Sequence, residues 1–348
     1  MNEEKFLLVK GIGGLGNRME CALTGILCAR LSGRRLLIDW SDHCYSNDGS
    51  NVFHRFFQCS ACPPTDEIPT TDSVSPGIWR GHLHRSAWDM RAQYGGVFDS
   101  ETWRKFSIDL TKLNYREDVV VMWTHSEKVD LLRDHFKGAF KEFAAASSGA
   151  ILSNLLEEDL ILHPDIRERV DQFRGTCFTK KTVGVHVRYT DFRSRLWTIL
   201  KKLNALLKRE PDLLIFLSTD NMQIKNMFEA SYPGVIITPH WYSSTPGLAI
   251  HGNRNCQDPI ESGIEALVDL YLLAECDYLI IDTNSSFSYV AKLLTKAPDS
   301  NIFDVGQRKK PSPYMRALTT RLMLKLGLYS WGLSLLSRFV RIQRSFNV

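Results

Sequence analysis

Residues 182–191, TVGVHVRYTD, constrain the fold of this chain more than any other stretch. They begin as an apolar run with β-branched residues, which predicts a buried strand. The run then turns abruptly polar, and His186 and Arg188 flank one valine, so alternation along a strand places both on the same face. Ligands of α/β proteins commonly sit just beyond such strand ends. An ordinary strand end with solvated polar residues is the alternative interpretation.

The second half of the chain repeats this pattern. The apolar runs at 213–217 and 278–281 lead into polar clusters at 218–221 and 282–286. Strands that alternate with helical patterns predict a parallel, doubly wound sheet, with a nucleotide-like ligand at the edge where these polar clusters meet. The further predicted elements of this half are strands at 235–237 and 301–305 and helices following residue 196, from 221 to about 232, at 260–274 and at 288–294.

The first half opens with an apolar strand at 6–9, a glycine-rich stretch at 11–19, a helical pattern that Gly33 can stop, and a strand at 35–40. This is a βαβ opening, in which glycines allow a tight turn and the helix N-terminus offers free N–H groups to an anion. The letters GxGxxG occur at 11–16, but a lone match is weak and we do not expect NAD. Residues 41–118 are poorly patterned and predict short strands and loops. A strand at 119–123 and helices at 130–143, from 151 and from 164 follow.

Charge is distributed unevenly along the 348 residues. The net charge is +4, yet no acidic residue follows Asp304, and nine of the 43 basic residues do. The remaining chain therefore carries 34 basic and 39 acidic residues and is slightly acidic. Residues 314–342 combine these basic residues with apolar positions at helical spacing, which is typical of helices on anionic membranes. Packing of that helix against the first domain is the alternative. The acidic body lacks the basic, aromatic-rich stripe of a nucleic-acid-binding protein, so we expect no nucleic acid partner.

The cysteines indicate a reducing compartment. The eight cysteines are scattered, and several lie within apolar patterns, where a thiol packs as a small hydrophobe. Cys59 and Cys62 form a CxxC, but a zinc site would need a second pair at similar spacing, and the sequence has none. The opening MNEEKFLLVKG lacks the pattern of a signal peptide, and no apolar run reaches the roughly 20 residues of a spanning helix. We expect a cytoplasmic protein without a bound metal.

Three motifs together resemble those of the GDP-fucose-dependent fucosyltransferase superfamily, most closely the nodulation and α1,6-fucosyltransferases. HVRYTD at 186–191 resembles the His-x-Arg-Arg-x-Asp motif, and FLSTDN at 216–221 matches the second motif. Residues 266–294 match the third motif closely, and GGLGNRM at 13–19 resembles the N-terminal loop of α1,2-fucosyltransferases. The resemblance covers about residues 5–305. Each motif alone is modest, but their order and spacing are fairly specific.

The resemblance implies a GT-B fold, in which two Rossmann-like domains face each other across a cleft. We expect an acceptor-side domain at 1–170, a GDP-sugar-binding domain at 171–312 and a basic helical tail at 313–348. The implied activity is inverting transfer of L-fucose from GDP-fucose, without a metal or other cofactor, to a hydroxyl of an oligosaccharide or a lipid-linked glycan. Polysaccharide biosynthesis at the cytoplasmic face of a membrane fits such a tail. A GT-B enzyme with another nucleotide sugar, or a non-enzymatic membrane-binding protein, is the alternative.

The same resemblance implies roles for individual residues. Arg188 would contact the β-phosphate of the donor, where a guanidinium stabilises the negative charge that develops on departing GDP. Asp191 lines the same pocket. An aspartate that accepts from guanine would explain a preference for GDP. The residues expected to bind substrate are Gly13, Gly14, Gly16, Asn17, His186, Tyr189, Asp220, Asp269, Ser285 and Ser286.

The chain departs from the family pattern at two places. Tyr189 replaces the second arginine of the motif, which weakens the phosphate clamp or changes its role. Residues 192–196, FRSRL, lack the acids that follow the motif in α1,6 enzymes, so their general base is absent here. The transfer still needs a group that accepts the proton of the acceptor hydroxyl. Asp191 and His43 are the catalytic candidates, and two further carboxylates, Asp39 and Asp42, remain open, each with a structural role as its alternative.

Overall fold

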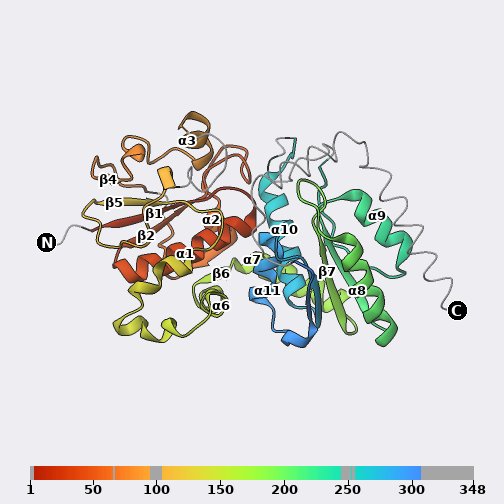
Figure 1. The fold of residues 1–348 in the computed structure, drawn as a ribbon. Coiled ribbons are helices and arrows are strands. Elements are labelled where there is room, and N and C mark those ends of the chain that lie inside the picture. Colours follow the sequence, from red (N-terminus) through yellow and green to blue (C-terminus); the bar gives the residue numbers. More distant parts are fainter. Residues whose placement is uncertain (1–3, 66, 95–103, 244–251, 253–254, 307–348) are drawn as a thin grey trace, which may run out of the picture. The chain divides into compact units, whose positions relative to one another are not determined.

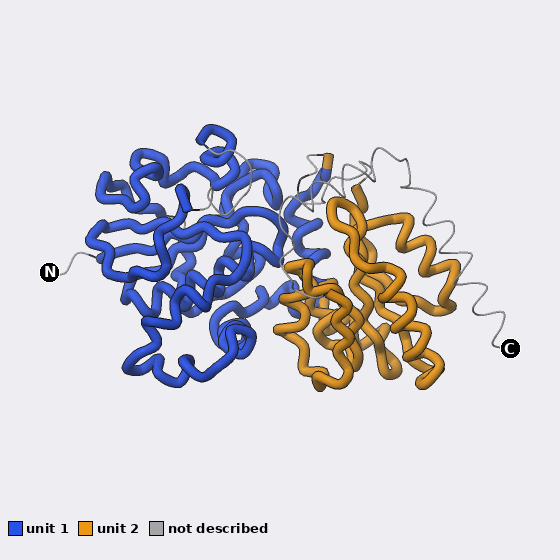
Figure 2. Tube along the Cα trace, viewed as in Figure 1, with its two compact units in different colours: residues 1–169, 256–268 blue, residues 170–255, 269–348 orange. Residues whose placement is uncertain are grey.

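The structure is a computed structural model that describes residues 4–65, 67–94, 104–243, 252 and 255–306. The chain forms two compact units, coloured separately in Figure 2. Unit 1 comprises residues 1–169 and 256–268, and unit 2 comprises residues 170–255 and 269–348. Two helices, α7 (Pro164–Cys177) and α10 (Pro259–Ala274), begin in unit 1 and end in unit 2.

Unit 1 is built on a parallel sheet with the strand order β2-β1-β5-β4 (Figure 1). Its strands are β1 (Phe6–Lys10), β2 (Arg35–Asp39), β4 (Val74–Ser75) and β5 (Val119–Met122). A small antiparallel pair joins β3 (Phe57–Cys59) to β6 (Leu160–Leu162). The α-helices are α1 (Leu15–Ser32), α2 (Phe53–Phe56), α3 (Ala87–Tyr94), α5 (Val129–Leu132) and α6 (Ser148–Glu158), and the 3-10 turns are η1 (Gly77–Trp79), η2 (Arg133–His135) and η3 (Gly138–Ala144).

Unit 2 contains a second parallel sheet, in the order β10-β9-β7-β8. Its strands are β7 (Thr182–Val187), β8 (Leu214–Thr219), β9 (Tyr278–Ile281) and β10 (Ile302–Asp304). The helices that connect them are α8 (Leu196–Arg209), α9 (Met222–Ser231) and α11 (Ser286–Leu294), with a 3-10 turn, η5 (Asp299–Asn301), before β10. The predicted α/β fold with parallel sheets is confirmed.

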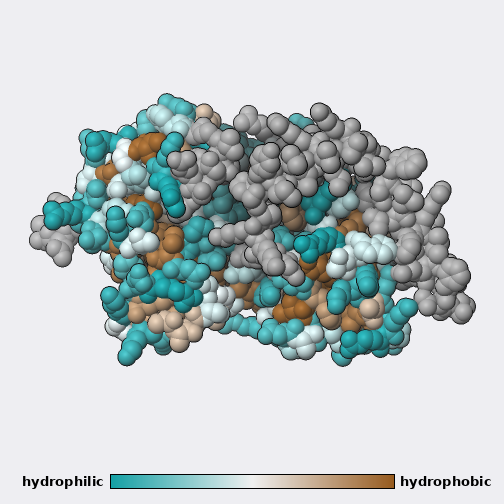
Figure 3. All heavy atoms as spheres, viewed as in Figure 1, coloured by the Kyte–Doolittle hydropathy of each residue, from teal (hydrophilic) through white to brown (hydrophobic). Residues whose placement is uncertain are grey.

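Each sheet packs its apolar face against helices or loops. In unit 2 the apolar face of α8 is buried in one cluster with α9 and the sheet, including Leu203, Phe228 and Val185. In unit 1, Trp79 and Trp123 are buried with residues of β1 and β5. Hydrophilic side chains cover much of the described surface on the face shown in Figure 3. The large apolar side chains that are exposed come from different elements, as is ordinary for a soluble fold.

Two predicted elements differ from the structure. The helix predicted at 130–143 is instead α5 followed by the turns η2 and η3, because Phe136 and Lys137 leave the helical region, with ψ 77° and 164°, and Gly138 takes a left-handed conformation with φ 59°. The strand predicted at 235–237 is reduced to a single parallel bridge between Ile236 and Phe216, and Pro239 follows it closely. The three predicted polar strand ends nevertheless all follow strands of one sheet.

Candidate functional site

The strand order of the second sheet places its topological switch point between β7 and β9. From β7 the chain continues to β8 on one side, whereas β9 lies on the other side, so the crossovers leave in opposite directions. Ligands of doubly wound sheets bind outside the carboxyl ends of the strands at this switch point. The residues that follow β7 and β9 are 188–195 and 282–286, which include the predicted Arg188, Ser285 and Ser286.

Arg188 and Asp191 form a bidentate pair beyond the end of β7. Arg188 Nε donates to Asp191 Oδ1 at 2.9 Å, and Nη2 donates to Asp191 Oδ2 at 2.6 Å. Both side chains are partly exposed, at 22% and 33%. This geometry occupies the Nε side of the guanidinium and leaves its outer edge, formed by Nη1 and Nη2, for a second anion.

Asp220 fixes the backbone of the same loop. Its Oδ1 accepts the Tyr189 N–H at 2.6 Å, and its Oδ2 accepts the Thr190 hydroxyl at 2.5 Å. Removal from water raises the pKa of Asp220, while these hydrogen bonds and the charge of Arg188 oppose that shift. Asp220 was predicted to bind substrate, and in this structure its hydrogen bonds hold the loop that carries Arg188.

His186 joins the end of β7 to the start of α11. The side chain is buried, its Nδ1 lies 2.6 Å from Ser288 Oγ, and its ring packs 4.9 Å from that of Phe287. Burial, together with the nearby charge of Arg188, lowers the pKa of His186 to about 3. His186 is therefore a neutral imidazole at physiological pH, and it ties the Arg188 loop to the first turn of α11.

The N-terminus of α11 offers groups suited to an anion. Ser285 is the N-cap residue, but its hydroxyl makes no capping hydrogen bond, and the first turn carries no acidic side chain. Ser285 is 1% exposed, and its Oγ has no hydrogen-bond partner among the described residues. The preceding Asp282 accepts hydrogen bonds from the backbone and side chain of Asn284, which shapes the loop. A helix N-terminus beside a buried hydroxyl that lacks a partner among the described residues suits a phosphate.

Asp269 lies in a second polar cluster of unit 2. It is 5% exposed and accepts a hydrogen bond from the Thr238 hydroxyl. Burial raises the pKa of Asp269, while the charge of His240 and hydrogen bonds from Thr238 and Ser218 lower it. The two ring nitrogens of His240 lie near carbonyl oxygens, Nε2 at 3.0 Å from Thr219 and Nδ1 at 3.2 Å from Thr238. This cluster gives Asp269 a fixed orientation beside the end of β8.

In unit 1 the glycine-rich stretch divides between a turn and a helix. Gly13 has φ 78°, which favours glycine, and Gly14 is the N-cap residue of α1. Gly16 and Asn17, expected in a loop, already belong to the first turn of α1. The Asn17 side-chain amide donates to the carbonyl oxygen of His125, which follows β5. The turn and the β5 loop are thus joined at the switch point of the first sheet, between β1 and β5.

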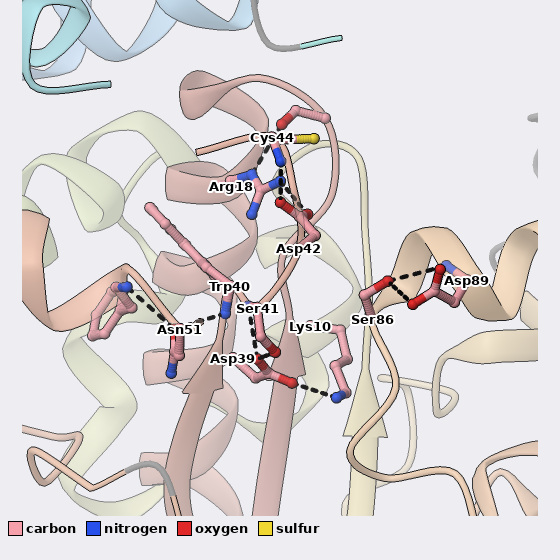
Figure 4. A network of polar contacts seen from close by, with 12 residues as sticks. Lys10, Arg18, Asp39, Trp40, Ser41, Asp42, Cys44, Asn51, Ser86 and Asp89 are labelled. Atoms are coloured by element: carbon pink, nitrogen blue, oxygen red, sulfur yellow. Dashed lines mark hydrogen bonds and ion pairs between the residues drawn. The ribbon is translucent and has the colours of Figure 1, made fainter. Parts of the chain in front are cut away.

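The three unit 1 candidates for a general base have different environments. Asp39 and Asp42 are buried and form ion pairs with Lys10 and Arg18, respectively (Figure 4). Each carboxylate is thus engaged by a buried cation, which argues for structural roles. His43, which directly follows Asp42 in the loop after β2, is exposed and packs beside Gly49. Of these three side chains, His43 is therefore the exposed one.

The described residues also address the metal and membrane expectations in part. Within residues 4–306, apart from the undescribed gaps, no group of three or more His, Cys, Asp or Glu side chains is placed to hold a metal ion. Cys59 and Cys62 are free thiols. Across the same described parts, no helix is long and apolar enough to cross a membrane. The predicted basic helix at 314–342 lies outside the described residues.

Several residues of these clusters were missed by sequence reasoning. Ser288 and Phe287 contact His186, and Thr238 and His240 surround Asp269. Ser288 follows the polar cluster at 282–286 within the third motif, so the motif could have indicated Ser288 as a residue of the site. Thr238 and His240 follow the predicted strand at 235–237, and their partner Asp269 lies 29 or more positions later, so no local pattern indicated them.

Comparisons with known proteins support the fold. The chain is 24% identical over 311 residues to Nodulation protein Z of Azorhizobium caulinodans, covering 81% of this chain and 87% of that protein. A crystal structure of NodZ α1,6-fucosyltransferase with GDP superimposes with a TM-score of 0.58 at 20% identity, covering 84% of this chain and 93% of that chain. The chain has the fold of NodZ. A mutant of Arabidopsis thaliana FUT1 in complex with GDP superimposes with a TM-score of 0.53 at 16% identity, covering 90% of this chain and 73% of that chain.

No protein-family model matches the chain. The resemblance predicted from the three motifs is nevertheless confirmed by these relatives, and the GT-B fold class is confirmed with it. The sequence identities are low, so the roles of individual residues depend on the geometry of this chain.

Proposed function

We propose that this chain is an inverting glycosyltransferase that moves L-fucose from GDP-fucose to a hydroxyl of a glycan acceptor. The observation that best supports this proposal is the arrangement at the β7–β9 edge, where His186 connects the Arg188 loop to the N-terminus of α11. A guanidinium with a free outer edge and a helix N-terminus with an unsatisfied hydroxyl together suit a diphosphate. One solved neighbour, NodZ α1,6-fucosyltransferase, is named for fucosyl transfer and was crystallised with GDP, which supports fucose and guanosine as parts of the donor.

The proposed chemistry depends on stabilisation of the leaving group. When the bond between the sugar and the β-phosphate breaks, negative charge grows on the departing GDP. Arg188 and the N–H groups at the start of α11 are fixed before the reaction, so they stabilise this charge without reorganisation. We propose that Asp191 orients Arg188, since both its oxygens already accept from the guanidinium. No metal is required in this scheme because the protein supplies the positive charge.

The remaining predicted residues complete the proposed site. Gly13, Gly14, Gly16 and Asn17 offer backbone and amide groups to the substrate, and Asp269 accepts hydrogen bonds from guanine. Tyr189, whose N–H is held by Asp220, keeps the Arg188 loop in shape. His43 is the proposed acceptor of the proton from the glycan hydroxyl, supported by its exposure in the loop after β2.

The acceptor and location are proposed from the charge pattern of the sequence. The basic, apolar residues at 314–342 would hold the protein at the cytoplasmic face of an anionic membrane, where a lipid-linked oligosaccharide is accessible. Co-sedimentation of the full chain with vesicles of phosphatidylglycerol, compared with vesicles of phosphatidylcholine, tests this. Equal recovery in both supernatants would exclude charge-driven membrane binding.

Isothermal calorimetry with GDP, UDP, ADP and CDP, each with and without EDTA, tests the donor assignment. We expect GDP to bind selectively and independently of EDTA, and GDP-fucose to be consumed with a suitable acceptor glycan. Preference for another diphosphate would retain the glycosyltransferase class but exclude fucose. Absence of binding by all four nucleotides would refute the proposed function.

A further inference from the structure

Arg18 lies completely buried beneath the glycine turn that precedes α1 (Figure 4). Its Nε donates to the Gly13 carbonyl oxygen at 2.9 Å, and its Nη2 forms an ion pair with Asp42. The guanidinium lies 5.0 Å from the ring centroid of Tyr45 and 5.7 Å from that of Trp40. One side chain therefore joins the turn after β1, the first turn of α1 and the loop after β2.

Stability alone is a weak explanation for this arrangement. Transfer of both charges from water into the interior opposes their attraction, and apolar residues of similar volume often replace such a pair without loss of stability. Arg18 Nη1 is also buried without a hydrogen-bond partner among the described residues, which adds a further desolvation cost. A buried charge kept under these conditions indicates a requirement for one particular local conformation.

The conformation that the pair fixes is that of the glycine turn. Gly13 is held in the left-handed region, at φ 78°, and its carbonyl oxygen accepts from Arg18. The turn packs closely at Gly11, where an added Cβ would lie 2.5 Å from Trp40 Cδ1. Asp42 extends the restraint, because its Oδ1 accepts the Cys44 N–H at 2.9 Å and so fixes the loop that carries His43.

We propose that Arg18 and Asp42 are positioning residues for the transfer reaction. Their ion pair sets the turn at residues 13–17, so that its N–H groups meet the substrate in the orientation that the transition state requires. This inference rests on the proposed function, in which that turn binds substrate. A small displacement of such groups lowers the rate of transfer strongly, because preorganised donors stabilise charge that develops only during the reaction.

The test replaces the pair by apolar residues, Arg18→Met/Asp42→Leu, and measures thermal stability, binding of GMP and kcat for fucosyl transfer. We expect the melting temperature to stay within about 5 °C of that of the wild type. GMP binding should be unchanged, because its proposed contacts lie in unit 2. We expect kcat to fall about 100-fold. A folded variant whose kcat is within about twofold of the wild type would overturn the inference.

The matched control is Lys10→Met/Asp39→Leu, which removes the other ion pair of Figure 4. Lys10 Nζ donates to the carbonyl oxygens of Leu83 and Arg85, and neither side chain of this pair hydrogen-bonds to residues 13–17, so this variant should retain kcat. An equal loss of kcat in both double variants would show a general packing effect and overturn the inference.

Arg18→Lys covers the case in which the apolar variant fails to fold. Lysine keeps the charge opposite Asp42 but lacks the fork that reaches Gly13 at the same time. We expect a folded protein with normal GMP binding and reduced kcat. Wild-type kcat in this variant, or loss of GMP binding in parallel with kcat, would overturn the inference. Failure of the wild-type protein itself to bind GDP would instead refute the proposed function.

Discussion

Replacement of Arg188 by alanine is the most direct test of the site at the β7–β9 edge. The substitution removes the guanidinium that Asp191 holds at 2.6 and 2.9 Å and that offers its outer edge to the donor. The side chain is not part of the buried core, so the fold should persist. What remains is the negative charge of Asp191 at the position proposed for a diphosphate, and this adds repulsion to the lost attraction.

The expected magnitude follows from the number and charge of the contacts. A hydrogen bond between charged groups contributes about 1.5–3 kcal/mol, which corresponds to a Kd for GDP raised roughly 10- to 100-fold. Contacts that strengthen as the leaving group gains charge affect kcat more, and loss of one such donor costs about 100- to 1000-fold. The double variant Arg188→Ala/Asp191→Ala should bind GDP more tightly than Arg188→Ala, because the negative charge of Asp191 no longer repels the diphosphate.

Calorimetry with GDP and a fixed-time transfer assay measure the two effects. Arg209→Ala is the matched control, since it removes the same charge from the exposed C-terminal end of α8, away from the carboxyl edge of the sheet. We expect this control to bind GDP and transfer fucose like the wild type. An Arg188→Ala protein with wild-type kcat and Kd would refute the assigned role, and equal losses in the control would indicate a non-specific charge effect.

Two further predictions concern stability and binding in unit 2. The pKa of His186 is about 3 in the folded protein, below its value in the unfolded chain, so the unfolded state binds an extra proton as the pH falls. The free energy of unfolding should therefore decrease from about pH 6.5 towards pH 3, with a slope of at most about 1.4 kcal/mol per pH unit, and urea titrations should show a smaller slope for His186→Asn. Ser285→Ala removes a buried hydroxyl without a partner among the described residues, so its melting temperature should be unchanged or higher, whereas its Kd for GDP should rise about tenfold; a wild-type Kd would exclude Ser285 from the phosphate site.

The sequence predicted the repeating architecture because hydrophobic periodicity is a local signal. The strands β7, β8 and β9 and the buried face of α8 all appear as predicted. The helix expected at 130–143 is interrupted in the structure, because hydrophobic periodicity carries no information about the backbone angles of residues 136–138. The sequence also contains no local signal that residues 256–268 belong to unit 1. Their membership depends on tertiary packing, such as that of Gly263 against Phe56 and Tyr45.

The candidate site was predictable in its residue types more than in its interactions. Polar strand ends identified Arg188, Asp191 and Ser285, because the carboxyl edge of a parallel sheet gathers such residues. The sequence did not distinguish a free carboxylate from a paired one. Asp39 and Asp42 were equal to His43 as base candidates until their partners, Lys10 and Arg18, were located in space. Pairing over such distances in the chain depends on tertiary structure.

Asp269→Asn tests how the nucleobase is selected. A carboxylate accepts hydrogen bonds from both the N1–H and the amino group of guanine, whereas an asparagine offers one acceptor and one donor group. The Thr238 hydroxyl already donates to Asp269, so an asparagine can keep that contact and the fold. We expect GDP affinity to fall about 10-fold or more while ADP affinity stays constant, so the preference for GDP over ADP becomes smaller. Thr238→Val is the control for orientation alone, and it should weaken GDP binding less than Asp269→Asn. If Asp269→Asn retained the GDP selectivity of the wild type, guanine recognition would have to lie elsewhere in unit 2.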